Sequence, residues 1–322
     1  MKFLITGGAG FIGSYLSEEL LKLNNEVIAM DNLSTGRYEN VEHLLTNKNF
    51  EFVEGSILDV RLVDKLAEKV DIIFHLAAAV GVELIVKEPL ESLTTNIKGS
   101  EIVLEMANRY HKKILITSTS EIYGKNVNGP LKEDDDRILG SPLKVRWSYS
   151  TAKAVDEMLA YVYWKEKKVP SIIVRLFNTV GPRQTGAYGM VMPRFISQAL
   201  KNEPITVYGT GKQSRCFVHV KDVVKALTKL IEEPKAIGEV FNIGSQEEVT
   251  IEQLAREIIK ITKSNSKIEY IPYEKAYEEG FEDMQRRVPD ISKINKLIGF
   301  RPTFDLSEII KDIVSYLKSI KP

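Results

Sequence analysis

Residues 6–13, TGGAGFIG, place glycines at a turn between an apolar run and a helical pattern, and this turn constrains the fold most. Gly7 permits a tight turn at the end of a strand, Gly10 lets the backbone approach a pyrophosphate, and Gly13 lets a helix pack close to a sheet. Free N–H groups and the helix dipole favour negative charge at such a helix N-terminus. The spacing therefore predicts a dinucleotide-binding turn, with NAD or a relative as its ligand.

A carboxylate follows the glycines at the distance expected for this kind of fold. Asp31 ends the second apolar run, 26–30, roughly 20 residues beyond the turn. A carboxylate at this position accepts hydrogen bonds from the adenosine ribose hydroxyls and repels a 2′-phosphate. We therefore expect NAD to bind in preference to NADP. The alternative is that Asp31 merely starts a turn with Asn32.

The composition excludes several classes of partner and site. The 44 basic and 44 acidic residues among 322 give no global attraction to nucleic acid or to an anionic membrane. A single cysteine, Cys216, excludes an intrachain disulfide framework, and the histidines show no metal-ligand grouping. No apolar run approaches membrane-spanning length, and no cleavable leader pattern is present. We expect a cytoplasmic protein without a metal.

Apolar runs alternate with helical patterns through the first half of the chain. Strands are expected near 2–6, 26–30, 50–53, 71–75, 113–118 and 171–176, and helices near 12–23, 60–69, 92–110 and 149–168. This alternation predicts an α/β fold of the Rossmann type, with a doubly wound parallel sheet and a smaller α/β substrate-binding lobe. Glycines and prolines interrupt the pattern after Phe177. The expected domains are 1–177, continued by about 218–262, and a lobe of 178–217 plus 263–322.

A second motif carries groups suited to acid–base chemistry. Tyr149 and Lys153 stand four apart in YSTAK within a helical segment, so the phenol and the ammonium share one face. A phenol has an ordinary pKa of about 10, but an ammonium and a positive nicotinamide both favour the phenolate. Thr119, at the end of the strand near 113–118, supplies a hydroxyl for the same substrate oxygen. Tyr149 is therefore predicted to accept the proton of a substrate hydroxyl during its oxidation.

Motifs along essentially the whole chain resemble those of the extended short-chain dehydrogenase/reductase family. The closest resemblance is to its nucleotide-sugar epimerases, dehydratases and decarboxylases, which implies NAD as cofactor and a nucleotide sugar, expected to be UDP-linked, as substrate. The motifs are TGGAGFIG (6–13), DNLSTG (31–36), GSILD (55–59), HLAA (75–78), TNIKG (95–99), STSEIYG (118–124), YSTAK (149–153), FNTVGPR (177–183), VYGTGKQSRCFVHVKD (207–222), FNIGS (241–245) and RVPD (287–290).

The resemblance implies a role for each matching residue. Catalysis falls to Thr119, Ser120, Glu121, Tyr149 and Lys153. The cofactor contacts are Gly7, Gly10, Phe11, Ile12, Gly13, Asp31, Asn32, Ser34, Thr35, Gly36, Ser56, Ile57, Asp59, Leu76, Ala77, Ala78, Asn96, Thr117, Tyr149 and Lys153, with Ile57 and Asp59 at the adenine. The substrate contacts are Val80, Asn178, Arg183, Val207, Tyr208, Arg215 and Arg287. Asn178 is expected at the sugar or pyrophosphate, and Arg215 and Arg287 at the phosphates, because arginine pairs bidentately with phosphate.

Glu121 guides the choice among reactions that share a 4-keto intermediate. The pair Ser120-Glu121 resembles that of UDP-glucuronate decarboxylases and some GDP-sugar dehydratases, whereas ordinary UDP-glucose 4-epimerases commonly lack this carboxylate. VRWSY (145–149) and QTGAYGM (184–190) depart from the decarboxylase pattern and keep an epimerase open. Decarboxylation of a UDP-hexuronate such as UDP-glucuronate therefore ranks first, 4-epimerisation of a UDP-hexose or UDP-glucuronate second and 4,6-dehydration third. A non-catalytic nucleotide sensor is the alternative from another class, and the intact Thr119, Tyr149 and Lys153 argue against it.

Further residues have a less specific interpretation. The aromatic residues Tyr161, Tyr163 and Trp164 in the helix near 149–168 favour a homodimer, as does the family resemblance. Trp147 is interpreted as an active-site wall or as interface packing. His75 is interpreted as a buried core or cofactor-wall residue. The tract 273–283 is interpreted as a substrate lid or as a solvated loop or helix.

Overall fold

The computed structural model describes residues 1–79, 89–186, 190–276 and 284–320. Within these ranges, seven parallel strands form one sheet in the order β11-β6-β5-β4-β1-β2-β3. The strands are β1 (Lys2–Thr6), β2 (Glu26–Asp31), β3 (Phe50–Glu54), β4 (Ile72–His75), β5 (Lys113–Thr119), β6 (Ser171–Leu176) and β11 (Val240–Ile243). The central strands are continuously apolar because both of their faces are covered. The predicted doubly wound parallel sheet is confirmed.

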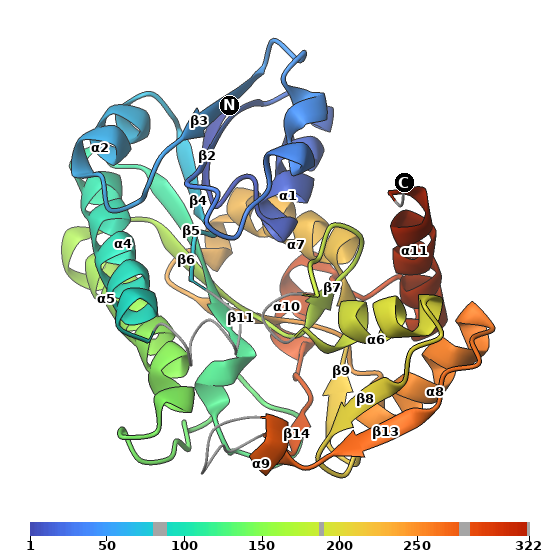
Figure 1. Ribbon diagram of the computed structural model, residues 1–322. Helices are drawn as coiled ribbons and strands as arrows, with labels where there is room; N and C mark the ends of the chain where they lie inside the picture. Colours follow the sequence, from blue (N-terminus) through green and yellow to red (C-terminus); the bar gives the residue numbers. More distant parts are fainter. Residues whose placement is uncertain (80–88, 187–189, 277–283, 321–322) are drawn as a thin grey trace.

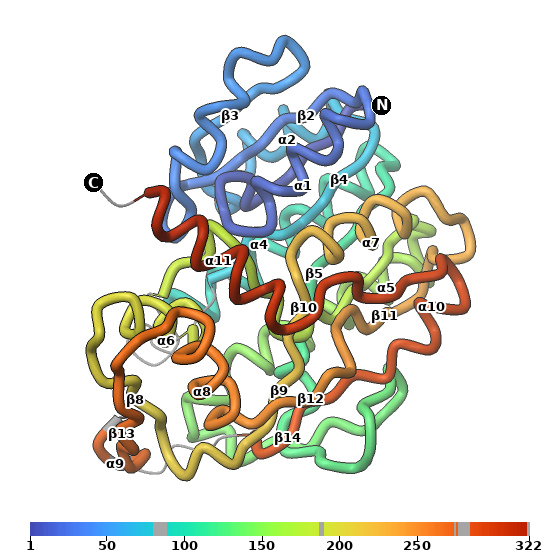
Figure 2. Tube along the Cα trace, turned by 90° about the vertical axis from the view of Figure 1, so that its right-hand side faces the viewer, coloured from blue at the N-terminus to red at the C-terminus, as the bar shows by residue number. Residues whose placement is uncertain are grey.

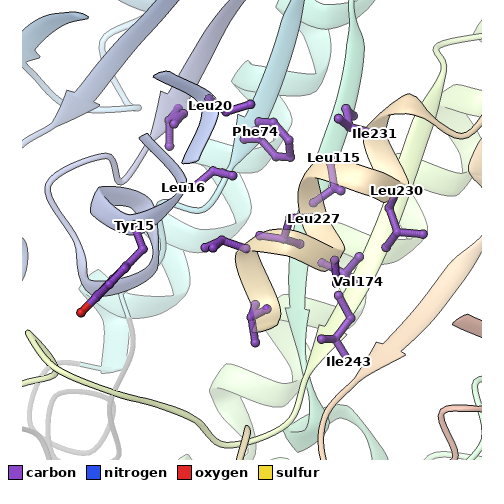
Figure 3. Packing of buried hydrophobic residues seen from close by; sticks show 14 of the residues in the cluster. Tyr15, Leu16, Leu20, Phe74, Leu115, Val174, Leu227, Leu230, Ile231 and Ile243 are labelled. Atoms are coloured by element: carbon purple, nitrogen blue, oxygen red, sulfur yellow. The ribbon is translucent and has the colours of Figure 1, made fainter. Parts of the chain in front are cut away.

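Helices cover both faces of the sheet (Figure 1). One layer contains α2 (Val60–Glu68), α4 (Pro89–Arg109) and α5 (Ser148–Lys167), and the other α1 (Phe11–Lys22), α7 (Val220–Glu232) and α10 (Ser292–Ile298). Figure 3 shows the second layer from close by, where Leu16 and Leu20 of α1 and Leu227 of α7 pack with Phe74 and Leu115 of the sheet. Two hydrophobic layers thus hold the strand ends in place.

A smaller lobe lies beside the carboxyl ends of the strands. Its core joins α6 (Val191–Leu200), α8 (Ile251–Thr262) and α11 (Leu306–Ser319) to β8 (Ile205–Tyr208) and β13 (Ile268–Ile271), as Figure 2 shows from the side. The other elements are β12 (Glu248–Thr250), β9 (Ser214–Cys216), β14 (Arg286–Arg287), β7 (Thr179–Val180), β10 (Val218–His219), α9 (Tyr273–Ala276) and the 3-10 turns η1 (Tyr38–Asn40), η2 (Glu42–Leu44), η3 (Ser120–Tyr123), η4 (Val145–Trp147) and η6 (Pro234–Ala236). Among the described residues, every helix is too short or too polar to span a lipid bilayer.

Local sequence signals set the starts of the lobe helices. The Thr250 side chain accepts from the Gln253 backbone N–H, and the Gln253 side chain accepts from the Thr250 backbone N–H. Asp305 and Glu308 form the same reciprocal arrangement at the start of α11. Each pair satisfies two backbone donors that a helix N-terminus would otherwise leave exposed.

We propose a domain division that differs from the expected one in two segments. The expected sheet domain included 251–262, but the apolar side chains of α8 pack with α6 and α11 in the core of the lobe. The expected lobe included residues 291–300, but Ile291, Ile294 and Phe300 belong to the core beneath α7. The order of elements along the chain does not reveal whether a helix near the C-terminus packs on the sheet or in the lobe, because long-range packing decides this.

Candidate functional site

One cavity of about 750 Å³ runs along the carboxyl ends of β2, β1, β4 and β5 and continues beneath the lobe. Its walls come from both parts of the molecule. The sheet supplies the glycine turn, Asp31, residues 76–79 and residues 117–121, and the lobe side supplies residues 190–194, Arg215 and Arg287. Ligands of open parallel sheets bind in this position.

The glycine turn leaves room for a ligand next to the first helix. Gly7 has a φ of +74°, and a Cβ at this residue would lie 2.8 Å from the Ala77 backbone nitrogen. A Cβ at Gly13 would collide with the Gly7 carbonyl oxygen, so this helix approaches the turn only with glycine there. Gly10 is the N-cap of α1, whose first residues line the cavity. The N-terminus of α1 is therefore placed to face a pyrophosphate.

Asp31 is buried at the end of β2, at one end of the cavity. Its carboxylate accepts hydrogen bonds from the backbone N–H groups of Ala9 (3.0 Å) and Leu33 (2.8 Å). Burial raises the pKa of this carboxyl, and the backbone N–H groups act against that rise. A Cβ at Gly36 would lie 2.7 Å from the carboxylate oxygens, so a glycine is required where the chain passes Asp31.

Most of the predicted cofactor residues line this cavity. They are Gly7, Gly10, Phe11, Ile12, Gly13, Asp31, Asn32, Ser34, Thr35, Ile57, Leu76, Ala77, Ala78, Thr117 and Tyr149. The predicted residues Gly36, Ser56, Asp59, Asn96 and Lys153 are not in its lining.

The residues outside the lining have structural partners instead. Asp59, expected at the adenine, caps α2 by accepting from the backbone N–H groups of Arg61 and Leu62. The Ser56 hydroxyl accepts from the Leu58 N–H. The Asn96 side-chain amide accepts from the backbone N–H of Ala79 and donates to its carbonyl oxygen. These three side chains therefore shape the loops of the cavity wall.

Thr119 and Tyr149 both line the cavity. The Thr119 hydroxyl accepts from the Glu121 N–H (3.2 Å) and keeps its own hydrogen to donate. Tyr149 is buried on the first turn of α5. Burial raises the pKa of its phenol well above the ordinary value, and the carboxylates of Glu121 and Asp156 act in the same direction.

Lys153, which was expected to lower the pKa of Tyr149, is not in the lining of the cavity. Its ammonium is 2.6 Å from Oδ2 of Asp156, and both side chains are buried. A spacing of three on a helix brings Asp156 as close to Lys153 as a spacing of four brings Tyr149. The oppositely charged neighbour binds the ammonium here.

Glu121 is enclosed by guanidinium groups at the far end of the cavity. Arg146 Nη1 lies 2.6 Å from its Oε2, and Arg287 Nη1 lies 2.8 Å from its Oε1. Arg287 also donates to the Ser120 hydroxyl (3.1 Å). Burial raises the pKa of the Glu121 carboxyl, but Arg146, Arg287 and Arg215 outweigh burial and hold that pKa at about 2. The carboxylate therefore stays ionised at neutral pH.

Arg146 is a site residue that sequence reasoning missed. It lies in η4, three residues before Tyr149, and its guanidinium is buried in the cavity wall. The segment 145–149 departed from the expected pattern, but the Arg146 partner stands 25 positions earlier, at residue 121. Trp147 is buried in the subunit and outside the cavity lining, so neither interpretation offered for it describes this structure.

The predicted substrate residues fall into three groups: five line the cavity, one is buried in the lobe and one lies outside the described residues. Asn178, Tyr208, Arg215 and Arg287 line the cavity, with the Asn178 amide anchored to the Cys216 carbonyl (2.9 Å). Arg183 also lines it, but its guanidinium is bound to Glu18 and Ser14 of α1 and lies over the Tyr15 ring. Val207 is buried in the core of the lobe because alternate residues of β8 face opposite sides. Val80 lies outside the described residues, as does most of the tract 273–283, whose Tyr273 lines the cavity.

Two buried polar side chains outside the cavity lining, Arg175 and His75, are bound to other buried groups. Arg175 of β6 pairs with Glu157 of α5 (2.8 Å) and donates to the Tyr123 hydroxyl (2.9 Å). His75 is a buried core residue, with Nδ1 2.8 Å from the Thr6 hydroxyl and Nε2 3.0 Å from the Ser100 hydroxyl. Burial, assisted by Lys153, lowers the pKa of His75 to about 3, so its ring is neutral. Within the described ranges no metal-binding group of His, Cys, Asp and Glu is found.

The Glu121 cluster predicts a pH-dependent contribution to stability. The Glu121 pKa falls from 4.5 to about 2 in the folded protein, so its ionised form stabilises the fold above the unfolded value. Glu121→Gln should lower the free energy of unfolding by roughly 3 kcal/mol at neutral pH, and the deficit should shrink as the pH falls from about 5 to 3. Urea unfolding at several pH values measures this difference. Glu269→Gln, at an exposed position, should show no such trend, and a deficit at Glu121 that is constant with pH would contradict the assignment.

Comparisons with known proteins agree with this architecture. A family model described as GDP-mannose 4,6 dehydratase matches residues 4–313. UDP-N-acetyl-alpha-D-glucosaminuronate decarboxylase of Bacillus cytotoxicus is 41% identical over 99% of this chain and 98% of that protein, and UDP-glucuronic acid decarboxylase 1 of Danio rerio is 37% identical over 98% and 72%. The structure of UDP-glucuronic acid 4-epimerase from Bacillus cereus, in complex with UDP-glucuronic acid and NAD, has 31% identity and a TM-score of 0.89 over 100% of both chains. The chain therefore belongs to the family of that GDP-mannose 4,6 dehydratase model, within the extended short-chain dehydrogenase/reductases.

Proposed function

We propose that this protein is an NAD-dependent enzyme that decarboxylates a UDP-linked hexuronate through a 4-keto intermediate. The observation that carries the proposal is the cluster of Arg146, Glu121 and Arg287 beside Thr119 and Tyr149. The relatives named as decarboxylases, at 41% and 37% identity, support the same reaction.

The charge of the cluster suits an acidic sugar. Arg146 and Arg287 share the single carboxylate of Glu121, and buried Arg215 adds another positive charge to the same part of the cavity. A nucleoside diphosphate linked to a hexuronate brings negative charge on both its pyrophosphate and its C6 carboxylate. Since a guanidinium presents five donors, an arginine can bind the carboxylate of Glu121 and an acidic ligand at the same time.

The cavity fits NAD at the other end. The glycine turn at the N-terminus of α1 accommodates a pyrophosphate, and Asp31 is placed to accept from the adenosine ribose hydroxyls and to disfavour NADP. When bound, NAD supplies the oxidation at sugar C4 and the later reduction. Thr119 and Tyr149 then lie beside the C4 oxygen in this proposal, with Tyr149 accepting the hydroxyl proton.

The role of Glu121 follows from its ionisation. A carboxyl with a pKa of about 2 cannot donate a proton at neutral pH, so Glu121 is not the acid that delivers a proton to C5. Its charge instead holds Arg146 and Arg287 in place beside the sugar. Loss of CO₂ from a 4-keto acid requires no base, because the ketone accepts the electron pair of the breaking C–C bond. The enolate that remains then takes its C5 proton from water.

A product assay tests the proposed reaction. The NAD-loaded protein is incubated with UDP-glucuronate, with UDP-N-acetylglucosaminuronate and with UDP-glucose, and the products are identified by mass and NMR. The proposal predicts loss of CO₂ from an acidic substrate, and Tyr149→Phe should reduce turnover by at least about 100-fold. An acidic product of unchanged mass would replace the decarboxylase by a 4-epimerase, and loss of water would indicate a dehydratase.

A 4-epimerase of the same acidic nucleotide sugar is the second candidate. It is favoured by the 31% identity to the UDP-glucuronic acid 4-epimerase of Bacillus cereus. Thr119 and Tyr149 suffice for that reaction, because returning hydrogen to the other face of the ketone needs no further acid or base. The cluster around Glu121 would bind the C6 carboxylate in this case too.

We further propose a cytoplasmic homodimer formed through α4 and α5, which pack side by side (Figure 1). Met158, Tyr161 and Val162 lie on one exposed face of α5, and Leu90 of α4 is 78% exposed. Spacings of three and four place the α5 residues on a single face. The single, buried Cys216 suits a reducing compartment.

Light scattering tests the dimer. The wild-type protein should have twice the mass of the 36.4 kDa chain, and Met158→Glu should give monomers because it buries a charge in the apolar contact. Ile320→Glu, at an exposed apolar residue after α11 on the other side of the molecule, is the matched control and should remain dimeric. A wild-type mass of one chain at micromolar concentration would refute the proposal.

A further inference from the structure

A charged contact that the proposed mechanism does not use joins α1 to a wall of the cavity. Arg183 donates to Oε1 of Glu18 through Nη2 and to the Ser14 hydroxyl through Nη1 (3.2 Å). Its guanidinium also lies over the Tyr15 ring, 4.4 Å from the ring centre. Only 18% of the Arg183 side chain and 17% of the Glu18 side chain are exposed. Three residues of α1 therefore hold this guanidinium on one face of the helix.

Arg183 belongs to a wall segment of the cavity, residues 178–185. The lining residues of this segment are Asn178, Thr179, Val180, Arg183, Gln184 and Thr185. A Cβ at Gly181 would lie 3.5 Å from Cζ of Phe11, the first residue of α1, which lines the same cavity. The wall segment therefore lies against the N-terminal end of α1, where the pyrophosphate of NAD is expected.

The backbone of the wall segment is bent at the residue that makes the ion pair. Arg183 has a φ of +70°, a conformation that residues with a side chain rarely adopt. At its start the segment is anchored by the pairing of β7 with β10, and the Gln184 side chain donates to the Thr179 carbonyl (3.0 Å). The contacts of Arg183 with α1 hold the other end. Such a strained residue persists only where its surroundings fix it.

We propose that Glu18 is a positioning residue for the cofactor, which acts through Arg183 to hold the wall segment against α1 and thereby slows the release of NAD. Glu18 is not in the lining of the cavity, whereas Arg183 is. Movement of the segment away from α1 requires this partly buried ion pair to break. The proposal goes beyond the proposed function, because every reaction considered for this site uses NAD.

Glu18 has another partner, which provides a control. His43 of η2 has its Nε2 2.7 Å from the same Oε1 of Glu18, but its side chain is 48% exposed and it is not in the cavity lining. A role of Glu18 through His43 would therefore concern the loop after β2 rather than the wall segment. Replacing His43 separates the two roles.

An exchange experiment measures NAD release without any substrate. Protein loaded with radiolabelled NAD is mixed with an excess of unlabelled NAD, and the label that stays bound is followed with time. Glu18→Gln keeps the shape of the side chain but removes its charge, so it should release NAD about tenfold faster. His43→Gln should keep the wild-type rate. So should Glu19→Gln, which removes the neighbouring carboxylate and its contact with Lys22 at 4.0 Å.

A double variant separates the proposed role from a general weakening of α1. Arg183→Gln removes the other partner of the ion pair, so adding Glu18→Gln to it should accelerate release no further. Additive effects, wild-type release in Glu18→Gln, or an equal acceleration in Glu19→Gln or His43→Gln would overturn the proposal.

Two further controls keep the test decisive. If Glu18→Gln does not fold, Glu18→Asp replaces it with the same expectation, because its shorter side chain draws the carboxylate away from Arg183. An inactive wild-type protein in the product assay would refute the proposed function alone, because NAD exchange needs no turnover.

Discussion

The ionisation of a buried carboxylate, Glu121, is the constraint on which the site depends. Burial alone would favour its neutral form, yet Arg146 and Arg287 hold it as an anion. The two arginines come from distant parts of the chain, η4 and β14, so this ion-pair cluster forms only in the folded chain, where β14 lies beside η4 and η3. Removing Glu121 would leave the buried guanidinium groups of Arg146 and Arg287 without their shared anion, which is costly.

The two ends of the cavity suit different ligands. The glycine turn and Asp31 form an end of the cavity suited to a dinucleotide, and the arginine cluster forms an end suited to an acidic nucleotide sugar. Thr119 and Tyr149 lie between them on elements held by buried polar contacts. Arg175 links α5 to η3 through Glu157 and Tyr123, and thus fixes the helix that carries Tyr149 to the turn that carries Glu121.

Features with a local physical cause could be predicted from the sequence. The glycine turn, the alternation of strands and helices and the position of Asp31 depend on neighbouring residues and short-range sterics. The seven-stranded sheet of the described residues agrees with the predicted alternation, and the glycine turn and Asp31 line the cavity.

Features set by competition between partners could not be predicted in this way. The spacing of Tyr149 and Lys153 correctly placed both on one helix, but Asp156 was an equally close and oppositely charged neighbour for the lysine. Arg183 was expected at the substrate and lines the cavity, but the sequence did not reveal that Glu18 of α1 binds its guanidinium. Arg146 had no local signal, because its ion-pair partner Glu121 stands 25 positions earlier in the chain.

The most direct test of the account is whether the arginine cluster recognises a sugar carboxylate. Calorimetry on NAD-loaded Tyr149→Phe, in which turnover is blocked, compares the affinities of UDP-glucuronate and UDP-glucose. The account predicts that UDP-glucuronate binds at least about tenfold more tightly, because its C6 carboxylate gains contacts with Arg146 and Arg287. Equal affinities, or tighter binding of UDP-glucose, would contradict it.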